Sequence, residues 1–198
     1  QVLTAAALHD IGGLWLTDRL SALDFEVEHT ALHSHIGSAL LASYPPLADL
    51  ADLLLHHHDY WDERGSAIPL GAQIIHLADR IDVLLKFGEN MCILGQVAGV
   101  CRRLEAVAGR MFDPELVDVL VNQVAKYEAF WLDLQPTMID KALAKKARPE
   151  PVVLDLDSLS GFAHMISQII DFRSRFTATH SSGVAAASAA IASCLGFS

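Results

Sequence analysis

Apolar side chains recur three or four residues apart along almost the whole chain, and this spacing constrains the fold more than any other feature. In the segment 70–87, for example, it places Ile74, Leu77 and Ile81 on one face of a helix. The same spacing predicts further helices over 47–58, 92–109, 113–132, 158–173 and 177–195. Asp113 and Pro114 suit the N-cap and first position of the helix over 113–132. Because no segment shows a convincing strand pattern, the sequence predicts an all-α helical bundle.

A change in amino-acid composition near residue 135 predicts a domain boundary. The stretch 135–157 carries four cations followed by two prolines, in the order Lys141, Lys145, Lys146, Arg148, Pro149 and Pro151. Without aromatic side chains between them, these cations favour a solvated linker or short exposed helix over a nucleic-acid surface. We therefore expect a helical domain at 1–134, a connector at 135–157 and a C-terminal helical pair at 158–198.

Composition excludes several partners. The 198 residues carry a formal net charge of −10, which disfavours duplex nucleic acid, because such binding depends on cations that neutralise phosphates. The longest apolar run, near 184–195, is too short to span a membrane. Cys92, Cys101 and Cys194 form no CxxC pair and lie in apolar helical contexts, so we expect reduced core residues and a cytoplasmic protein.

The positions of the histidines carry the chemical information. His9 and Asp10 end one apolar segment, His33 lies in a second, the run 56–58 is all histidine, and Asp79 lies in a further helix. Imidazole nitrogens and carboxylate oxygens together suit Fe, Mn, Ni or Zn, and a helical bundle can direct such groups into a shared interior. The alternative is a set of buried polar residues that hold no metal. We expect His35 and His56 to face solvent or to support the ligands.

The order of these groups resembles a known family. His9-Asp10-Ile11-Gly12, then His33 four residues before Gly37, then His57-His58, then the segment 68–74 leading to Ala78-Asp79 resembles the HD superfamily in its HD-GYP form, over about residues 3–134. The resemblance implies a helical bundle in which two or three metal ions activate a water that cleaves a phosphodiester, cyclic di-GMP in known members. It implies that Asp10 bridges the metals and is catalytic. The implied metal ligands are His9, Asp10, His33, His57, His58 and Asp79.

Two departures from the family pattern affect the substrate. Gly13 stands where the family usually has a lysine that can orient phosphate. The Gly-Tyr-Pro signature is absent, and the segment 62–68 is shorter than the corresponding family loop. Arg64 in this segment is a candidate for binding substrate phosphate, with a solvated loop arginine as the alternative.

The C-terminal segment resembles the helix that opens an HD-GYP domain and adds His180 as a candidate metal ligand. His180 begins a stripe that continues through Val184, Ala187 and Ile191. Two explanations stay open. In one, the chain is an excerpt of a tandem protein and this helix starts a second copy. In the other, the helix packs back onto the first domain, within one chain or swapped in a homodimer, so that His180 completes the site.

These observations predict a metal-dependent phosphohydrolase or phosphodiesterase domain in bacterial nucleotide signalling. The expected cofactor is a pair of divalent transition metal ions, and the expected partner is a phosphate-containing small molecule or cyclic dinucleotide. The alternative is an HD-type regulatory or dimerisation module that binds metal or ligand without significant turnover. A third hypothesis is hydrolysis of another phosphate ester, such as a nucleoside monophosphate.

Overall fold

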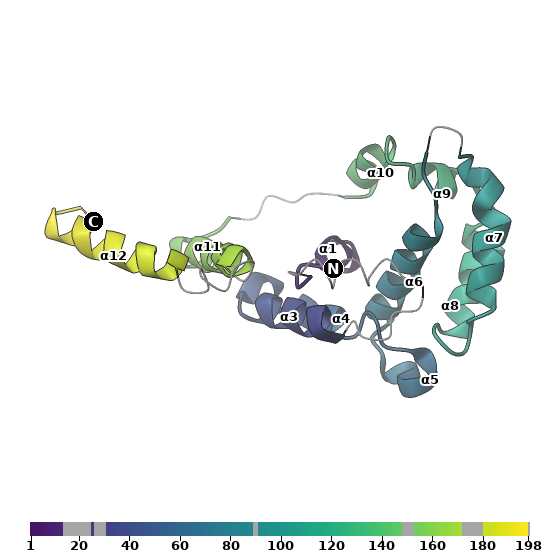
Figure 1. The fold of residues 1–198 in the computed structure, drawn as a ribbon, viewed down its shortest axis with the longest axis horizontal. Coiled ribbons are helices and arrows are strands. Elements are labelled where there is room, and N and C mark those ends of the chain that lie inside the picture. The colour runs from purple at the N-terminus through teal and green to yellow at the C-terminus, as the bar shows by residue number, and fades with distance from the viewer. Residues whose placement is uncertain (14–24, 26–30, 89–90, 148–152, 172–179, 198) are drawn as a thin grey trace.

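The computed structural model describes residues 1–13, 25, 31–88, 91–147, 153–171 and 180–197 (Figure 1). In these residues the regular elements are helices, and the pairing of Ala108 with Phe112 is an isolated bridge outside any strand. The predicted all-α fold is therefore confirmed. No described helix is long and apolar enough to cross a membrane.

The described elements fall into two parts along the chain. The first part contains α1 (Val2–Leu8), α3 (Ala31–Ala42), the 3-10 helix η1 (Pro45–Leu50), α4 (Ala51–Leu55), α5 (Trp61–Arg64), the 3-10 helix η2 (Gly65–Ala67) and α6 (Leu70–Leu84). The second part contains α7 (Ile93–Glu105), α8 (Pro114–Val119), the π-helical turn η3 (Leu120–Val124), α9 (Glu128–Asp133), α10 (Ile139–Lys146), α11 (Leu156–Asp171) and α12 (His180–Cys194).

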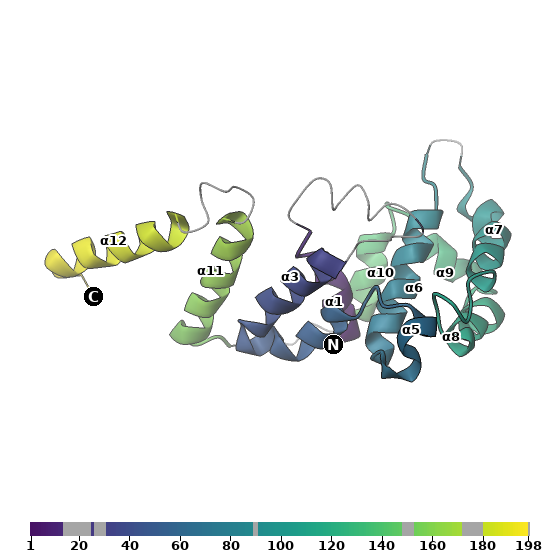
Figure 2. The same cartoon turned by 60° about the horizontal axis from the view of Figure 1, so that its bottom comes forward.

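Helix α6 takes part in two hydrophobic cores. Ile75 packs into the first core with residues of α1, α3 and α4, such as Leu41 and Leu54. Leu77 and Ile81 pack into the second core, which is built mainly from α7, α8 and α9. Figure 2 shows α6 between these groups of helices. Because α6 is packed on both sides, the side chains that it carries have well-fixed positions.

The helix expected over 47–58 is shorter than predicted. The structure has the 3-10 helix η1 and then α4, which ends at Leu55. Pro45 and Pro46 start η1, where a missing backbone N–H costs little. The histidine run 56–58 therefore lies in a turn after α4 instead of on a helix.

The helix expected over 113–132 is interrupted. Its predicted N-cap is confirmed, because the Asp113 carboxylate accepts a hydrogen bond from the Glu115 backbone N–H at 2.8 Å. After η3, however, Tyr127 is extended, and the Trp131 indole N–H donates to the Ala125 carbonyl at 2.8 Å. The helix is therefore broken where the Trp131 ring is buried. Tyr127, expected on the buried face, is 70% exposed.

The cysteines differ from expectation. Cys92 and Cys194 are exposed and Cys101 is half-buried, so the prediction that all three are core residues is wrong. Cys92 stands just before α7 and Cys194 ends α12, whereas Cys101 lies inside α7 and packs against the second core. All three thiols are free.

The two C-terminal helices are placed differently. Helix α11 packs against α3, with Met165 only 2% exposed in the first core and the Phe162 ring 5.9 Å from the Tyr44 ring. Helix α12 has no buried residue and contacts α11, where the Asp171 carboxylate accepts a 2.7 Å hydrogen bond from the Ser181 hydroxyl. Residues 172–179, part of the segment that resembles the family's opening helix, lie outside the described residues. The predicted division at 134 and 157 stays a prediction.

Candidate metal centre

Four elements of the N-terminal half bring the predicted ligands together. His9 and Asp10 follow the end of α1, His33 lies in α3, His57 and His58 lie in the turn after α4, and Asp79 lies in α6. The chain after Asp10 lies directly against α3, because a Cβ on Gly12 would stand 2.1 Å from the His33 carbonyl oxygen. Only glycine permits this approach, which brings Asp10 beside His33.

Two of the histidines have their tautomer set by the preceding helical turn. The Nδ1 of His9 lies 2.8 Å from the Ala6 carbonyl oxygen, and the Nδ1 of His57 lies 2.6 Å from the Leu54 carbonyl oxygen. A carbonyl can only accept, so Nδ1 carries the proton in both rings. The Nε2 atom of each ring is therefore left with a lone pair, and such a hydrogen bond is the usual support of a metal-ligating histidine.

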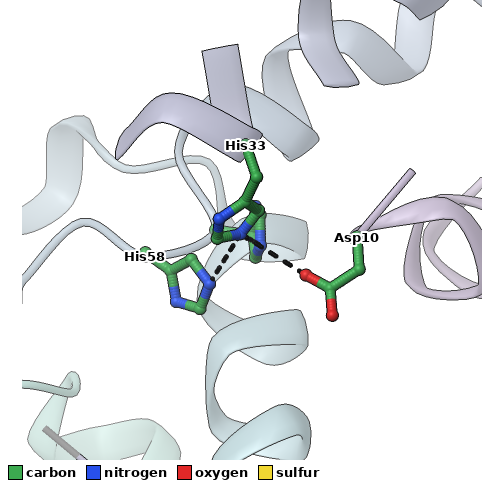
Figure 3. Close-up of side chains that lie close together, drawn as sticks. Asp10, His33 and His58 are labelled. Carbon is green, nitrogen blue, oxygen red and sulfur yellow. Dashed lines mark hydrogen bonds and ion pairs between the residues drawn. The ribbon is translucent and has the colours of Figure 1, made fainter. Parts of the chain in front are cut away.

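The Nε2 atom of His33 is the centre of the cluster. It lies 3.1 Å from His58 Nε2, 3.4 Å from His57 Nε2 and 3.4 Å from an Asp10 carboxylate oxygen. Figure 3 shows Asp10 and His58 directed toward the ring of His33. One ligand atom from each of Asp10, His33, His57 and His58 lies within 4.8 Å of the others.

This arrangement fits a cation. One proton on His33 Nε2 could be donated to only one neighbour, which would leave the other acceptors facing one another. Burial lowers the pKa of His57 to about 3 and the pKa of His58 well below its ordinary value, so both rings are neutral near pH 7. A divalent ion between them would satisfy all four lone pairs, and neutral imidazole with carboxylate is a ligand set for Fe, Mn, Ni or Zn.

Asp10 is directed to two groups at once. One carboxylate oxygen faces His33, and the other lies 3.4 Å from His9 Nε2. His9 Nε2 also lies 3.9 Å from one oxygen of Asp79, whose other oxygen forms a 2.6 Å ion pair with Arg80. Burial raises the pKa of Asp79, and the adjacent Arg80 opposes this shift. His9, Asp10 and Asp79 thus form a second group of potential ligands that shares Asp10 with the first.

The remaining predicted residues lie away from this cluster. Arg64 pairs with the Asp59 carboxylate at 3.1 Å and lies 3.0 Å from His56 Nδ1. His35 is exposed, as predicted, although it belongs to the same helix as His33. His180 begins α12, which lies beyond α11 and away from α1 in both views (Figures 1 and 2).

Two buried residues beside the ligands were not identified from the sequence. Arg80 is fully buried, and its guanidinium holds Asp79. His76 is 3% exposed, and its ring stands 5.4 Å from that of His58. The available signal was their place in α6, because His76 and Arg80 are one helical turn apart and flank Asp79.

The comparison with protein families agrees with this geometry. Residues 1–84 match the model of the HD domain, a span that includes every residue of both ligand groups. The resemblance to the HD superfamily is therefore confirmed over this part of the chain.

Characterised relatives of the chain are phosphodiesterases of cyclic dinucleotides. The chain is 28% identical over 197 residues to the 3′3′-cGAMP-specific phosphodiesterase 1 of Vibrio cholerae, an alignment that covers 93% of this chain and 45% of that protein. It is 29% identical over 140 residues to the cyclic di-GMP phosphodiesterase of Thermotoga maritima, covering 62% of this chain and 37% of that protein. The chain thus spans less than half the length of these relatives.

A solved structure supports the fold. The crystal structure of a cyclic GMP-AMP-specific phosphodiesterase of Vibrio cholerae (V-cGAP3) superimposes with a TM-score of 0.60 at 25% identity. The match covers 85% of this chain and 41% of that one. The HD-type bundle is therefore shared over most of the chain.

Proposed function

We propose that this chain is the metal-binding part of a cytoplasmic phosphodiesterase that hydrolyses a cyclic dinucleotide in bacterial nucleotide signalling. The observation that carries the proposal is the convergence of Asp10, His33, His57 and His58 on one point, with tautomers or pKa values that leave ligand lone pairs free. The relatives that act on 3′3′-cGAMP and cyclic di-GMP support the substrate class.

The residues divide the work of such a site. Asp10, His33, His57 and His58 would hold one divalent ion, and His9, Asp10 and Asp79 would hold a second, with Asp10 as the shared ligand. Metal ions in such a pair activate water and stabilise the negative charge that develops on phosphorus. Asp10 is half exposed, so substrate can approach the site from its side. His180 from another copy and Arg64, if released from Asp59, are the candidates for an additional ligand and for a phosphate contact.

The metal content of the purified chain tests the proposal. We expect wild-type protein, measured by elemental mass spectrometry, to carry about two equivalents of transition metal. Asp10→Ala removes the shared ligand and should reduce this content strongly, because both ions depend on it.

His35→Ala is the matched control for this experiment. His35 lies on the same helix as His33 but is exposed, so its loss should leave the metal content unchanged. Equal loss of metal in the two variants would contradict the assignment of α3, and wild-type protein without metal after incubation with Mn or Fe would contradict the metal centre.

A second candidate is a regulatory HD module without significant turnover. It is favoured by Gly13, which offers no side chain where the family has lysine, and by the short α5 and η2 that occupy the place of the family loop. The loss of a general acid typically reduces rates about a hundred- to ten-thousandfold.

Turnover of bis(4-nitrophenyl) phosphate separates the two candidates. An enzyme should hydrolyse this generic phosphodiester at a rate that Asp10→Ala abolishes, whereas a regulatory module should bind metal without hydrolysing it. Competition by cyclic di-GMP, 3′3′-cGAMP and nucleoside monophosphates then ranks the substrate classes.

A further inference from the structure

His76 is a buried histidine of α6 that does not belong to the ligand group. It is 3% exposed, and three rings surround it: Phe112 at 4.9 Å, His58 at 5.4 Å and Tyr60 at 6.1 Å. The rings of His58 and His76 meet edge to face, with an interplanar angle of 86°. A metal ligand is thus packed directly against an imidazole that contributes no ligand atom to the described cluster.

The hydrogen bond of His76 connects α6 to the chain that carries the ligands. The imidazole of His76 forms a hydrogen bond with the backbone of Asp59. A carbonyl oxygen can only accept, so a ring N–H of His76 donates this bond. Asp59 directly follows His58, and its own N–H donates to the His56 carbonyl at 3.1 Å.

These contacts hold the turn from two sides. The Asp59 N–H donates to the carbonyl of His56, the C-cap of α4, and the Asp59 carbonyl ties the same residue to α6, which is itself fixed between two cores. His57 and His58 lie between His56 and Asp59. The direction of His58 Nε2 toward His33, at 3.1 Å, therefore depends on the position of Asp59.

We infer that His76 is a positioning residue of the metal centre, whose ring and N–H fix the turn 56–59 so that His58 is presented to the metal. This role rests on the proposed metal site. It is distinct from ligation, because His76 acts through the Asp59 carbonyl and through contact with the His58 ring. Partners that orient metal ligands commonly contribute about ten- to a hundredfold to metal affinity.

Four variants separate positioning from general stability. His76→Phe keeps an aromatic ring in the pocket but removes the N–H. His76→Gln and His76→Asn each keep a side-chain N–H, at the two distances that correspond to the two imidazole nitrogens. Val117→Ala is the control, because Val117 is buried in the same core as Phe112 and carries no polar group.

Metal affinity and melting temperature are measured on each variant of the full chain. The apparent Kd for Mn²⁺ or Zn²⁺ comes from competition with a chelator, and the melting temperature from metal-free protein. We expect His76→Phe to weaken binding about ten- to a hundredfold, with partial recovery in His76→Gln or His76→Asn. Val117→Ala should lower the melting temperature but leave the Kd unchanged.

Wild-type affinity in His76→Phe would overturn the role of His76 while leaving the metal centre standing. A similar loss of affinity in Val117→Ala would also overturn it, because the effect would then follow stability. Wild-type protein that binds no metal would overturn the metal centre itself.

A measurement on wild-type protein covers the case in which His76→Phe does not fold. Long-range ¹H–¹⁵N spectra should show a His76 N–H that exchanges slowly with solvent, because it is buried and donates to a carbonyl. A His76 N–H that exchanges rapidly would overturn the assignment.

Discussion

At the scale of single residues, the site depends on where each imidazole keeps its proton. His9 and His57 each donate from Nδ1 to the carbonyl three residues earlier, so the same local hydrogen bond prepares both Nε2 atoms for a metal. Burial keeps His57 and His58 unprotonated in the absence of metal. Several polar rings are therefore buried together. Without a cation, the folded state tolerates this only while the rings are neutral, because a buried charge is unfavourable.

The burial of these neutral histidines predicts a steep dependence of stability on pH. The pKa of His57 and that of His76 are lowered to about 3, so between pH 6.5 and about 3 the unfolded chain binds protons that the folded chain does not. Each such histidine lowers the free energy of unfolding by about 1.4 kcal/mol per pH unit as the solution becomes more acidic. Asp79 acts in the opposite direction just above its ordinary pKa, because its folded-state pKa is raised.

Urea unfolding of chelator-treated protein at pH 7.5, 6.0 and 5.0 measures this dependence. The free energy of unfolding should fall with decreasing pH. In His76→Phe its slope against pH should be shallower, by the equivalent of up to one proton taken up on unfolding. An equal slope in both proteins would mean that His76 is protonated normally in the folded state.

At the scale of elements, the ligands are placed by interruptions of regular structure. Helix α4 ends at Leu55, and the turn that follows gives His57 and His58 directions that a continuing helix would not give to adjacent residues. The chain after α1 reaches α3 only because Gly12 has no Cβ, and Gly37 of α3 receives it, with a Cβ position 3.5 Å from the Gly12 nitrogen.

This close approach predicts a strong effect of Gly12→Ala. The new Cβ would lie 2.1 Å from the His33 carbonyl oxygen and 2.5 Å from the Gly37 nitrogen, both backbone atoms that cannot rotate away. We expect a loss of about 1–3 kcal/mol or more in stability, together with loss of metal as Asp10 moves away from His33. Thermal unfolding and elemental analysis measure the two effects.

Gly99→Ala is the matched control for Gly12→Ala. Gly99 lies inside α7 with no atom within 4 Å of its Cβ position, so alanine there should stabilise the protein by about 0.5–1 kcal/mol. Wild-type metal content in Gly12→Ala would contradict the assigned contact between this segment and α3.

At the scale of the whole molecule, the candidate metal centre lies in the part of the bundle where helices pack against both sides of α6. Helix α11 adds to the first core through Met165, whereas α12 lies beyond α11 without burying a residue. The candidate ligands therefore come from the chain just after α1, from α3, from the turn after α4, and from α6.

This arrangement predicts that α12 is dispensable for the site in a single chain. A variant that ends at Asp171 should keep its metal content and most of its thermal stability, as should His180→Ala. Met165→Ala should cost about 2–5 kcal/mol, because it removes a side chain from the first core. Loss of metal in the shortened chain would instead favour a swap in which His180 completes the site of another copy.

The sequence by itself determined the helical class and most of the chemistry of the site. Periodic apolar residues specify helices locally, and α6 and α7 lie close to the predicted ranges. The candidate ligands came from the order of the His and Asp residues, which resembles the HD superfamily, because a single His-Asp pair is a weak signal. Helix formation and the order of residue types depend on residues close together in the chain, so they can be predicted from local sequence patterns.

Only the tertiary structure decided how these groups face one another. The ion pair of Arg80 with Asp79, the ring of His76 against His58, and the indole N–H that ends a helix at Ala125 each depend on elements that the chain brings together from a distance. Buried polar groups must find partners wherever the packing places them. That requirement is satisfied in three dimensions, so the spacing of residues along one segment does not reveal it.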